Sequence, residues 1–249
     1  MELVNGERER NMSSKTYLIY GISKGLGKAF TQLLPSANDQ IYGISRTKPT
    51  YLEDQVNLTW VPADLSKPME ALNEIKSKIG ERKIDYLIYN VGIWEQTAFS
   101  DDYNFQESKP EEMLTMVNTN VSSCLLALQS FIENLKLSEN GKVIIIGSTW
   151  GLDHHNGKEV AFSATKFAVR GIVHALRENL REHQIGVSVL NLGFLEDMSV
   201  KDDLLKSEQV ESDGIPVQDV IHAVKFILST SNASCVKEIN MPAMQDVNM

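Results

Sequence analysis

The sequence contains few cysteines, little positive charge and no long apolar run. Only two of its 249 residues are cysteines, Cys124 and Cys235, which excludes a disulfide scaffold and a four-thiolate metal site. Acidic residues outnumber basic ones by 33 to 24, and the net charge of −9 argues against nucleic acid as a partner. No stretch reaches the roughly eighteen apolar residues that a membrane-spanning helix needs, so no membrane partner is expected.

Two further kinds of signal are missing. The five histidines show no spacing typical of metal ligands, so no metal site is predicted. The N-terminal segment MELVNGERERN is charged and lacks the apolar core of a signal peptide. We therefore expect a disordered leader over residues 1–14, a single domain over residues 15–249 and a cytoplasmic location.

What the sequence does contain is a regular alternation of short apolar runs with amphipathic stretches. Strands are predicted at residues 16–20, 40–45, 58–62, 84–90, 142–147, 187–191 and 236–239. Helices are predicted at residues 26–34, 68–79, 110–137, 160–183 and 217–229. Several strand runs, such as TYLIY and KVIIIG, are apolar throughout, which is typical of strands covered on both faces. The pattern predicts an α/β fold, a doubly wound parallel sheet of about seven strands with helices on both faces.

The first predicted strand leads into a helix through a glycine-rich turn. The turn reads G-I-S-K-G-L-G over residues 21–27. Glycines let the backbone approach a pyrophosphate closely, and the N-terminus of the following helix offers free N–H groups and a positive dipole end. The turn therefore favours a dinucleotide site, although an ordinary tight turn between a strand and a helix would have the same composition.

Further motifs follow the glycine turn in a fixed order. They are Asp64-Leu65, Y-N-V-G at 89–92, Asn120, S-T-W-G at 148–151, F-S-A-T-K at 162–166 and L-G-F at 192–194. In order and spacing this set resembles the classical short-chain dehydrogenase/reductase family, whose members have a Rossmann fold. The resemblance extends from residue 16 to about residue 239.

The resemblance assigns one group of residues to a dinucleotide cofactor. These residues are Gly21, Ser23, Lys24, Gly25, Leu26, Gly27, Ser45, Arg46, Thr47, Asp64, Leu65, Asn90, Val91, Gly92, Lys166, Gly193 and Leu195. An NAD enzyme usually has a carboxylate after the second strand, but here the sequence is Ser45-Arg46-Thr47. Arg46 can bind a 2′-phosphate with two parallel hydrogen bonds, and Lys24 adds a second positive charge. We therefore expect NADP(H) as the cofactor, rather than two cations that merely face solvent.

The resemblance also implies the catalytic residues. In the family a Tyr gives a proton to the substrate oxygen, and a Lys four residues later binds the nicotinamide ribose. A Ser orients the substrate, and an Asn supports a water. Lys166 and Asn120 match two of these positions. Ser148 and Thr149 both remain candidates for the Ser position, and Phe162 occupies the Tyr position without a proton to donate.

Other side chains could take part in the chemistry or in substrate binding. His154 and His155 follow the fifth predicted strand and could supply a proton, or they could be two solvated loop residues. Trp94 and Tyr103 are predicted to form apolar cover for a substrate. Specificity is expected to depend on segments 94–105 and 195–215, the second of which is predicted to be a substrate loop.

Two functions are compatible with these residues, and a third is disfavoured. The first is an NADP(H)-dependent oxidoreductase that reduces a carbonyl or a conjugated C=C bond of a small molecule without the Tyr acid. The second is a catalytically weak or inactive NADP(H)-binding protein that acts as a sensor or structural partner. The third, a sugar-nucleotide epimerase, would need a larger C-terminal domain. The helices at 110–137 and 160–183 resemble the pair through which the family forms dimers, so we expect a homodimer or homotetramer.

Overall fold

A computed structural model describes residues 14–153, 156–196 and 213–246. Its strands form one sheet in the order β3-β2-β1-β4-β5-β6-β7, and every neighbouring pair is parallel. The strands are β1 (Thr16–Tyr20), β2 (Gln40–Ser45), β3 (Leu58–Pro62), β4 (Tyr86–Tyr89), β5 (Lys142–Ile146), β6 (Gly186–Leu192) and β7 (Glu238–Met241). This sheet confirms the predicted doubly wound α/β fold.

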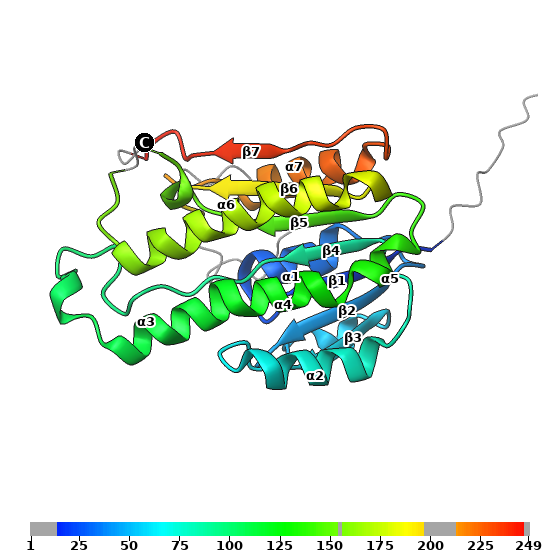
Figure 1. The fold of residues 1–249 in the computed structure, drawn as a ribbon, viewed down its shortest axis with the longest axis horizontal. Helices are drawn as coiled ribbons and strands as arrows, with labels where there is room; N and C mark the ends of the chain where they lie inside the picture. The colour runs from blue at the N-terminus through cyan, green and yellow to red at the C-terminus, as the bar shows by residue number, and fades with distance from the viewer. Residues whose placement is uncertain (1–13, 154–155, 197–212, 247–249) are drawn as a thin grey trace, which may run out of the picture.

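Helices cover both faces of the sheet, as Figure 1 shows. On one face lie α2 (Pro68–Ile79), α3 (Pro110–Val117), α4 (Ser123–Ser130), α5 (Ile132–Lys136) and α6 (Val160–Leu180). On the other face lie α1 (Gly25–Leu33) and α7 (Val217–Ser229). Two apolar cores result, because side chains of the buried strands alternate between the two layers of helices. Within the described residues, no helix is both long and apolar enough to cross a membrane.

The long helix predicted at 110–137 is interrupted twice, so that prediction is wrong in its continuity. A π-helical turn over Asn118–Ser122 separates α3 from α4. A second break occurs at Phe131, whose backbone leaves the helical region at φ −110 and ψ 13. Hydrophobic periodicity continues across both breaks, and for this reason the sequence pattern does not reveal them. The π turn has a direct consequence for the site, since it contains Asn120.

The other boundaries differ from the prediction by a few residues. β4 begins only at Tyr86, two residues later than predicted; the Ile84 N–H bonds to Asn134 outside the sheet, whereas the Asp85 N–H bonds to Thr16 at the start of β1. The helix predicted to end at 183 ends at Leu180, and a 3₁₀ turn over Arg181–His183 follows it. The edge strand β7 begins two residues later than predicted.

The strand order brings two of the predicted motifs together at the carboxyl edge of the sheet. β1 pairs with β2 on one side and with β4 on the other, so the direction of the connections reverses between β1 and β4. In open parallel sheets, ligands bind at the carboxyl ends of the strands at this reversal. The glycine turn after β1 and the Y-N-V-G segment at the end of β4 meet there.

Candidate active site

The glycine turn after β1 is packed so closely that side chains are excluded. A Cβ on Gly27 would lie 1.9 Å from the carbonyl oxygen of Gly21, and one on Gly21 would lie 2.1 Å from that of Asn90. Gly21 and Gly25 also have positive φ angles of 82° and 57°, which glycine adopts without strain. The backbone of the turn is therefore left bare at the carboxyl edge of the sheet.

The helix that follows this turn begins without a cap. Among the described residues, no side chain caps the first turn of α1, and that turn contains no acidic residue. Its first N–H groups and the positive end of its dipole remain available to an anion. Lys24, at the N-cap position, is exposed, and Ser23 beside it is half-buried. A bare turn and an uncapped helix fit the pyrophosphate of a dinucleotide.

β2 ends at the buried Ser45, and two exposed residues follow it. The Ser45 hydroxyl donates to the Thr47 carbonyl at 2.8 Å and accepts from Trp60 Nε1 at 3.1 Å, so it is already used within the protein. Arg46 and Thr47 are exposed. Within the described part of the chain, no carboxylate forms an ion pair with the Arg46 or Lys24 side chain at 4.0 Å or less.

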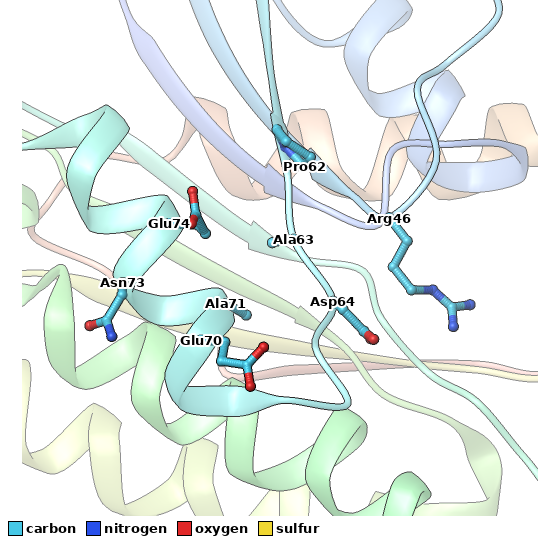
Figure 2. Close-up of a pocket in the computed structure, with 8 residues that line it drawn as sticks. All are labelled: Arg46, Pro62, Ala63, Asp64, Glu70, Ala71, Asn73 and Glu74. Atoms are coloured by element: carbon cyan, nitrogen blue, oxygen red, sulfur yellow. The ribbon is translucent and has the colours of Figure 1, made fainter.

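Arg46 borders a pocket of about 540 Å³ between the end of β3 and helix α2. Figure 2 shows Arg46 beside Asp64, with Glu70 and Glu74 on the α2 side of the pocket. Partial burial would raise the pKa of Asp64, but hydrogen bonds from Ser66, together with the charges of Arg46 and Lys67, lower it below its usual value. Asp64 is therefore held as a carboxylate, which can accept a hydrogen bond from an adenine amino group.

The remaining residues predicted to bind the cofactor lie along the same edge. Leu65 is buried, and its carbonyl accepts from the Ser123 hydroxyl at 2.7 Å. The Asn90 amide donates to the Gly21 carbonyl at 3.4 Å, which ties the end of β4 to the glycine turn. Further along the edge lie Leu26 and Val91, both packed in the apolar cores, Gly193, whose N–H donates to Met241, and Leu195, whose backbone pairs with Ile215.

Lys166 is the cation of the site whose pKa is shifted most. It is only 5% exposed, and its ammonium donates to the carbonyls of Ile146 and Gly147 at 3.3 and 3.4 Å. Burial lowers its pKa to about 8. A Cβ on Gly92 would lie 3.1 Å from Lys166 Nζ, so the glycine gives the ammonium its space. Within the described part of the chain the third N–H of the ammonium has no acceptor, so it can donate to a ligand hydroxyl beside Gly92.

Asn120 connects three parts of the site through its side chain. The amide oxygen accepts from Ile93 N at 2.9 Å, and the amide nitrogen donates to Ile93 O at 2.8 Å and to Thr165 Oγ1 at 3.1 Å. Most of its hydrogen-bonding capacity is therefore used to hold the loop after β4 against α6. This geometry favours a positioning role for the side chain.

Two hydroxyls lie at the end of β5. Ser148 Oγ accepts from Trp150 N at 3.2 Å and caps the short 3₁₀ turn Thr149–Gly151. Among the described residues its hydroxyl donates to no acceptor, which leaves the proton for a ligand. Thr149 Oγ1 is buried and has no hydrogen-bond partner among the described residues. Both can donate to a substrate oxygen, and the choice between them stays open.

Phe162 lies in the first turn of α6 and faces the lysine one turn later. Its ring centroid is 5.4 Å from Lys166 Nζ, and the side chain is 5% exposed. The ring also contacts Trp94 and Phe99 edge to face, with centroids 6.2 and 5.5 Å apart. Phe162, which the family resemblance predicts at the position of the catalytic Tyr, is thus part of an apolar aromatic cluster.

Two buried carboxylates beside this cluster were not found by sequence reasoning. Glu95 Oε1 accepts from the N–H groups of Ala161 and Phe162 at 3.0 and 3.3 Å, and from the Tyr103 hydroxyl at 3.2 Å. Glu159 accepts from Phe99 N at 2.9 Å and from Trp150 Nε1 at 2.6 Å. The two carboxylates attach the loop after β4 to the start of α6.

Tyr103 differs from its prediction as purely apolar cover. Its hydroxyl donates to Glu95 and accepts from Val160 N at 2.9 Å, so it completes the cap of α6. Burial and the adjacent Glu95 raise its pKa above the usual value. The described residues do not include His154, His155, residues 1–13 of the predicted leader (1–14) or residues 197–212 of the predicted substrate loop.

Known proteins of similar sequence or structure match most of this chain, including the site. A human 3-oxoacyl-acyl-carrier-protein reductase is 25% identical over 229 residues, which cover 87% of this chain and 92% of the reductase. Carbonyl reductase family member 4 of Xenopus laevis is 27% identical over 232 residues, with the same two coverages. The crystal structure of a metagenomic short-chain oxidoreductase in complex with NADP superposes with a TM-score of 0.72 at 19% identity, covering 93% of this chain and 98% of that one.

The family itself is established by a match to a family model over more than half of the chain. Residues 15–208 match the family described as short chain dehydrogenase. This range contains the glycine turn, Asn120, both hydroxyls at the end of β5, Phe162 and Lys166. The chain therefore belongs to the short chain dehydrogenase family of NAD(P)-dependent oxidoreductases.

Proposed function

We propose that the protein is an NADPH-dependent reductase that acts on a carbonyl or a conjugated C=C bond of a small molecule without a Tyr acid. The observation that carries the proposal is the pair formed by Phe162 and Lys166. Lys166 is buried near the end of β5, where Ser148 and Thr149 carry hydroxyls, as cofactor binding and catalysis would require. The Phe162 ring, 5.4 Å from the Lys166 ammonium, has no proton to donate.

The cofactor would lie along the carboxyl edge of the sheet. The bare glycine turn and the start of α1 would hold the pyrophosphate, and Lys166 would bind the nicotinamide ribose. Arg46 and Lys24, which are exposed and without ion-pair partners among the described residues, would bind a 2′-phosphate. When bound, NADPH supplies a hydride.

The protein's own residues would stabilise the charge that hydride addition creates. A hydrogen bond from Ser148 or Thr149 to the substrate oxygen can stabilise a developing alkoxide or enolate. The Lys166 ammonium adds positive charge nearby. When a conjugated C=C bond is reduced, the hydride adds to an alkene carbon and leaves an enolate, which water can protonate later. This substrate class therefore depends least on a strong acid. A simple carbonyl depends on it more, since loss of a general acid costs roughly 10²–10⁴ in rate.

The substitution Phe162→Tyr tests this proposal. The new hydroxyl would stand beside Lys166, so reduction of simple aldehydes and ketones should rise by roughly 10²-fold or more. NADPH oxidation is followed by absorbance, with enals and enones in the same panel, and product analysis separates C=C from C=O reduction. Lys166→Met in the Phe162→Tyr background is the matched control and should abolish the gain.

One result would replace the proposal by its alternative. If wild type and Phe162→Tyr both bind NADPH but transfer no hydride to any member of the panel, the protein is a non-catalytic NADP(H)-binding protein. Such a protein would use the cofactor as a redox signal or a structural element.

We also propose that the protein forms a homodimer or homotetramer through α3, α4 and α6. Leu114 and Val117 on α3 and Leu125 on α4 are exposed apolar side chains on this side of the fold. Such a group is more typical of an interface than of a solvated helix face. Sedimentation velocity on wild type and Leu125→Glu should show an oligomer that the charge weakens.

A further inference from the structure

Four aromatic rings lie together where the loop after β4 meets the start of α6. They belong to Trp94, Phe99, Trp150 and Phe162, which we call the aromatic wall. Phe99 contacts Trp150 and Phe162 with centroids 5.5 Å apart in both cases and with interplanar angles of 89° and 90°. Trp94 contacts Phe99 at 5.8 Å and Phe162 at 6.2 Å. The wall is therefore one continuous edge-to-face cluster drawn from three segments of the chain.

The wall is buried at one side and open at the other. Phe162, above Lys166, is 5% exposed, whereas Trp94 and Phe99 are 54% and 49% exposed. Single exposed apolar residues are ordinary on a protein surface. Two adjoining exposed aromatic rings that continue a cluster whose buried end lies beside Lys166 are typical of a ligand-binding surface.

The position of Phe99 is maintained against backbone strain. Its φ angle is +63°, a region that bulky side chains rarely adopt. The Phe99 N–H donates to Glu159 Oε1, and the other oxygen of that carboxylate accepts from Trp150 Nε1. One buried carboxylate thus fixes two rings of the wall relative to each other. Strain of this kind is concentrated at binding and catalytic sites.

The other rings are held from behind as well. Glu95, which follows Trp94, is 1% exposed and bonds the backbone N–H of Phe162. A Cβ on Gly157 would lie 1.9 Å from Trp150 Nε1, so the backbone of Gly157 is in direct contact with the indole ring. Rings fixed in this way lose little conformational entropy when a ligand binds.

We propose that the aromatic wall binds a planar aromatic ring of the substrate, carried next to the bond that is reduced. This proposal rests on the proposed function, which places the reduced bond near Lys166, and it adds the class of substrate. The open rings of Trp94 and Phe99 offer π surfaces to a flat ring, and aromatic pairs gain stabilisation beyond that of an equal apolar area. A saturated ring of the same size would bury a similar area without that gain. Trp94, Phe99 and Phe162 are then specificity-determining residues.

Binding of two unreactive alcohols tests the proposal independently of turnover. The probes are 3-phenylpropanol and 3-cyclohexylpropanol, titrated by NMR into the NADPH-saturated protein, in which an alcohol has no hydride acceptor, and into the cofactor-free protein. We expect the phenyl compound to bind at least about threefold more tightly in the wild type. Phe99→Leu and Trp94→Leu should remove this preference, and Phe99→Tyr should retain it. Phe226→Leu, at an exposed Phe of α7 that is not part of the wall, is the matched control and should change nothing.

The results of this binding experiment can be interpreted whether or not the proposed function is correct. Equal affinities of the two alcohols for the wild type would overturn the inference, even in a protein that reduces enals. A phenyl preference that survives in both leucine variants would also overturn it, since the ring would then bind elsewhere. A preference lost in both variants would support it, even if no hydride transfer were detected.

Discussion

The two halves of the carboxyl edge of the sheet are built in opposite ways. Over β1 and β2 the surface is bare backbone and cations: the glycine turn, an uncapped helix, Lys24 and Arg46. Over β4 and β5 it is aromatic rings held by the buried carboxylates of Glu95 and Glu159. The first half suits phosphate groups and the second suits an apolar ring. Lys166 lies beside the second half, and its buried ammonium donates to two backbone carbonyls, with no carboxylate partner among the described residues.

The largest expected effect is on stability, from Lys166→Met. In the folded protein the lysine pKa is about 8, whereas its ordinary value is 10.5, so the unfolded chain binds more protons between these two pH values. The burial cost is therefore present below pH 8 and disappears as the pH rises toward 10.5. We expect the variant to be more stable than wild type by up to about 3 kcal/mol at pH 7, and the difference to shrink by pH 10. Urea unfolding at both pH values measures it, and a variant less stable than wild type at pH 7 would show that the ammonium is well stabilised where it lies.

The next largest effect is expected on NADPH affinity, from Gly27→Val in the glycine turn. The new Cβ would meet the Gly21 carbonyl oxygen at 1.9 Å, so the turn must move away from the start of α1. We expect NADPH affinity to fall by at least about a hundredfold, measured by calorimetry. Binding that survives unchanged would mean that the cofactor does not depend on this turn.

A smaller effect is expected in the aromatic half, from Glu95→Ala. The substitution leaves two N–H groups of α6 and the Tyr103 hydroxyl without their acceptor. We expect a loss of about 1–3 kcal/mol in the free energy of unfolding. Glu95→Gln keeps one carbonyl acceptor and should lose less than half as much. Equal losses in the two variants would indicate that the charge, rather than the hydrogen bonds, holds α6.

The smallest effect is at a glycine that has no close neighbour. Gly171 lies within α6, and a Cβ there would meet nothing within 4 Å among the described residues. Gly171→Ala should therefore stabilise the protein by about 0.5–1 kcal/mol, because alanine loses less backbone entropy in a helix. Its NADPH affinity should equal that of wild type, which makes it the matched control for Gly27→Val.

The sequence predicts the backbone half of the site far better than the aromatic half. The glycine turn is read directly, because Gly21, Gly25 and Gly27 are neighbours in the chain and the strand and helix around them have clear periodicity. The parallel fold follows from the same alternation of apolar runs. Lys166, Asn120 and Phe162 are found only through the resemblance, since nothing in their local pattern distinguishes them from other helix residues.

The aromatic half depends on contacts between distant positions. Glu95 bonds residues 66 and 67 positions away, and Glu159 bonds Phe99 across 60 positions. A glutamate in a polar loop gives no sign that it will be buried. The interruption of the long helix at Asn118–Ser122 is hidden for a related reason, because the apolar periodicity continues through it. Such features are visible only when the folded chain brings their partners together.

The most direct measurement is the titration of NADPH and NADH into the wild-type protein under identical conditions. Arg46 and Lys24 lie at the end of the site where a 2′-phosphate would be, so NADPH should bind at least about tenfold more tightly than NADH. Arg46→Asp should reduce or reverse this preference. Equal affinities for the two cofactors, or no binding of either, would contradict the account.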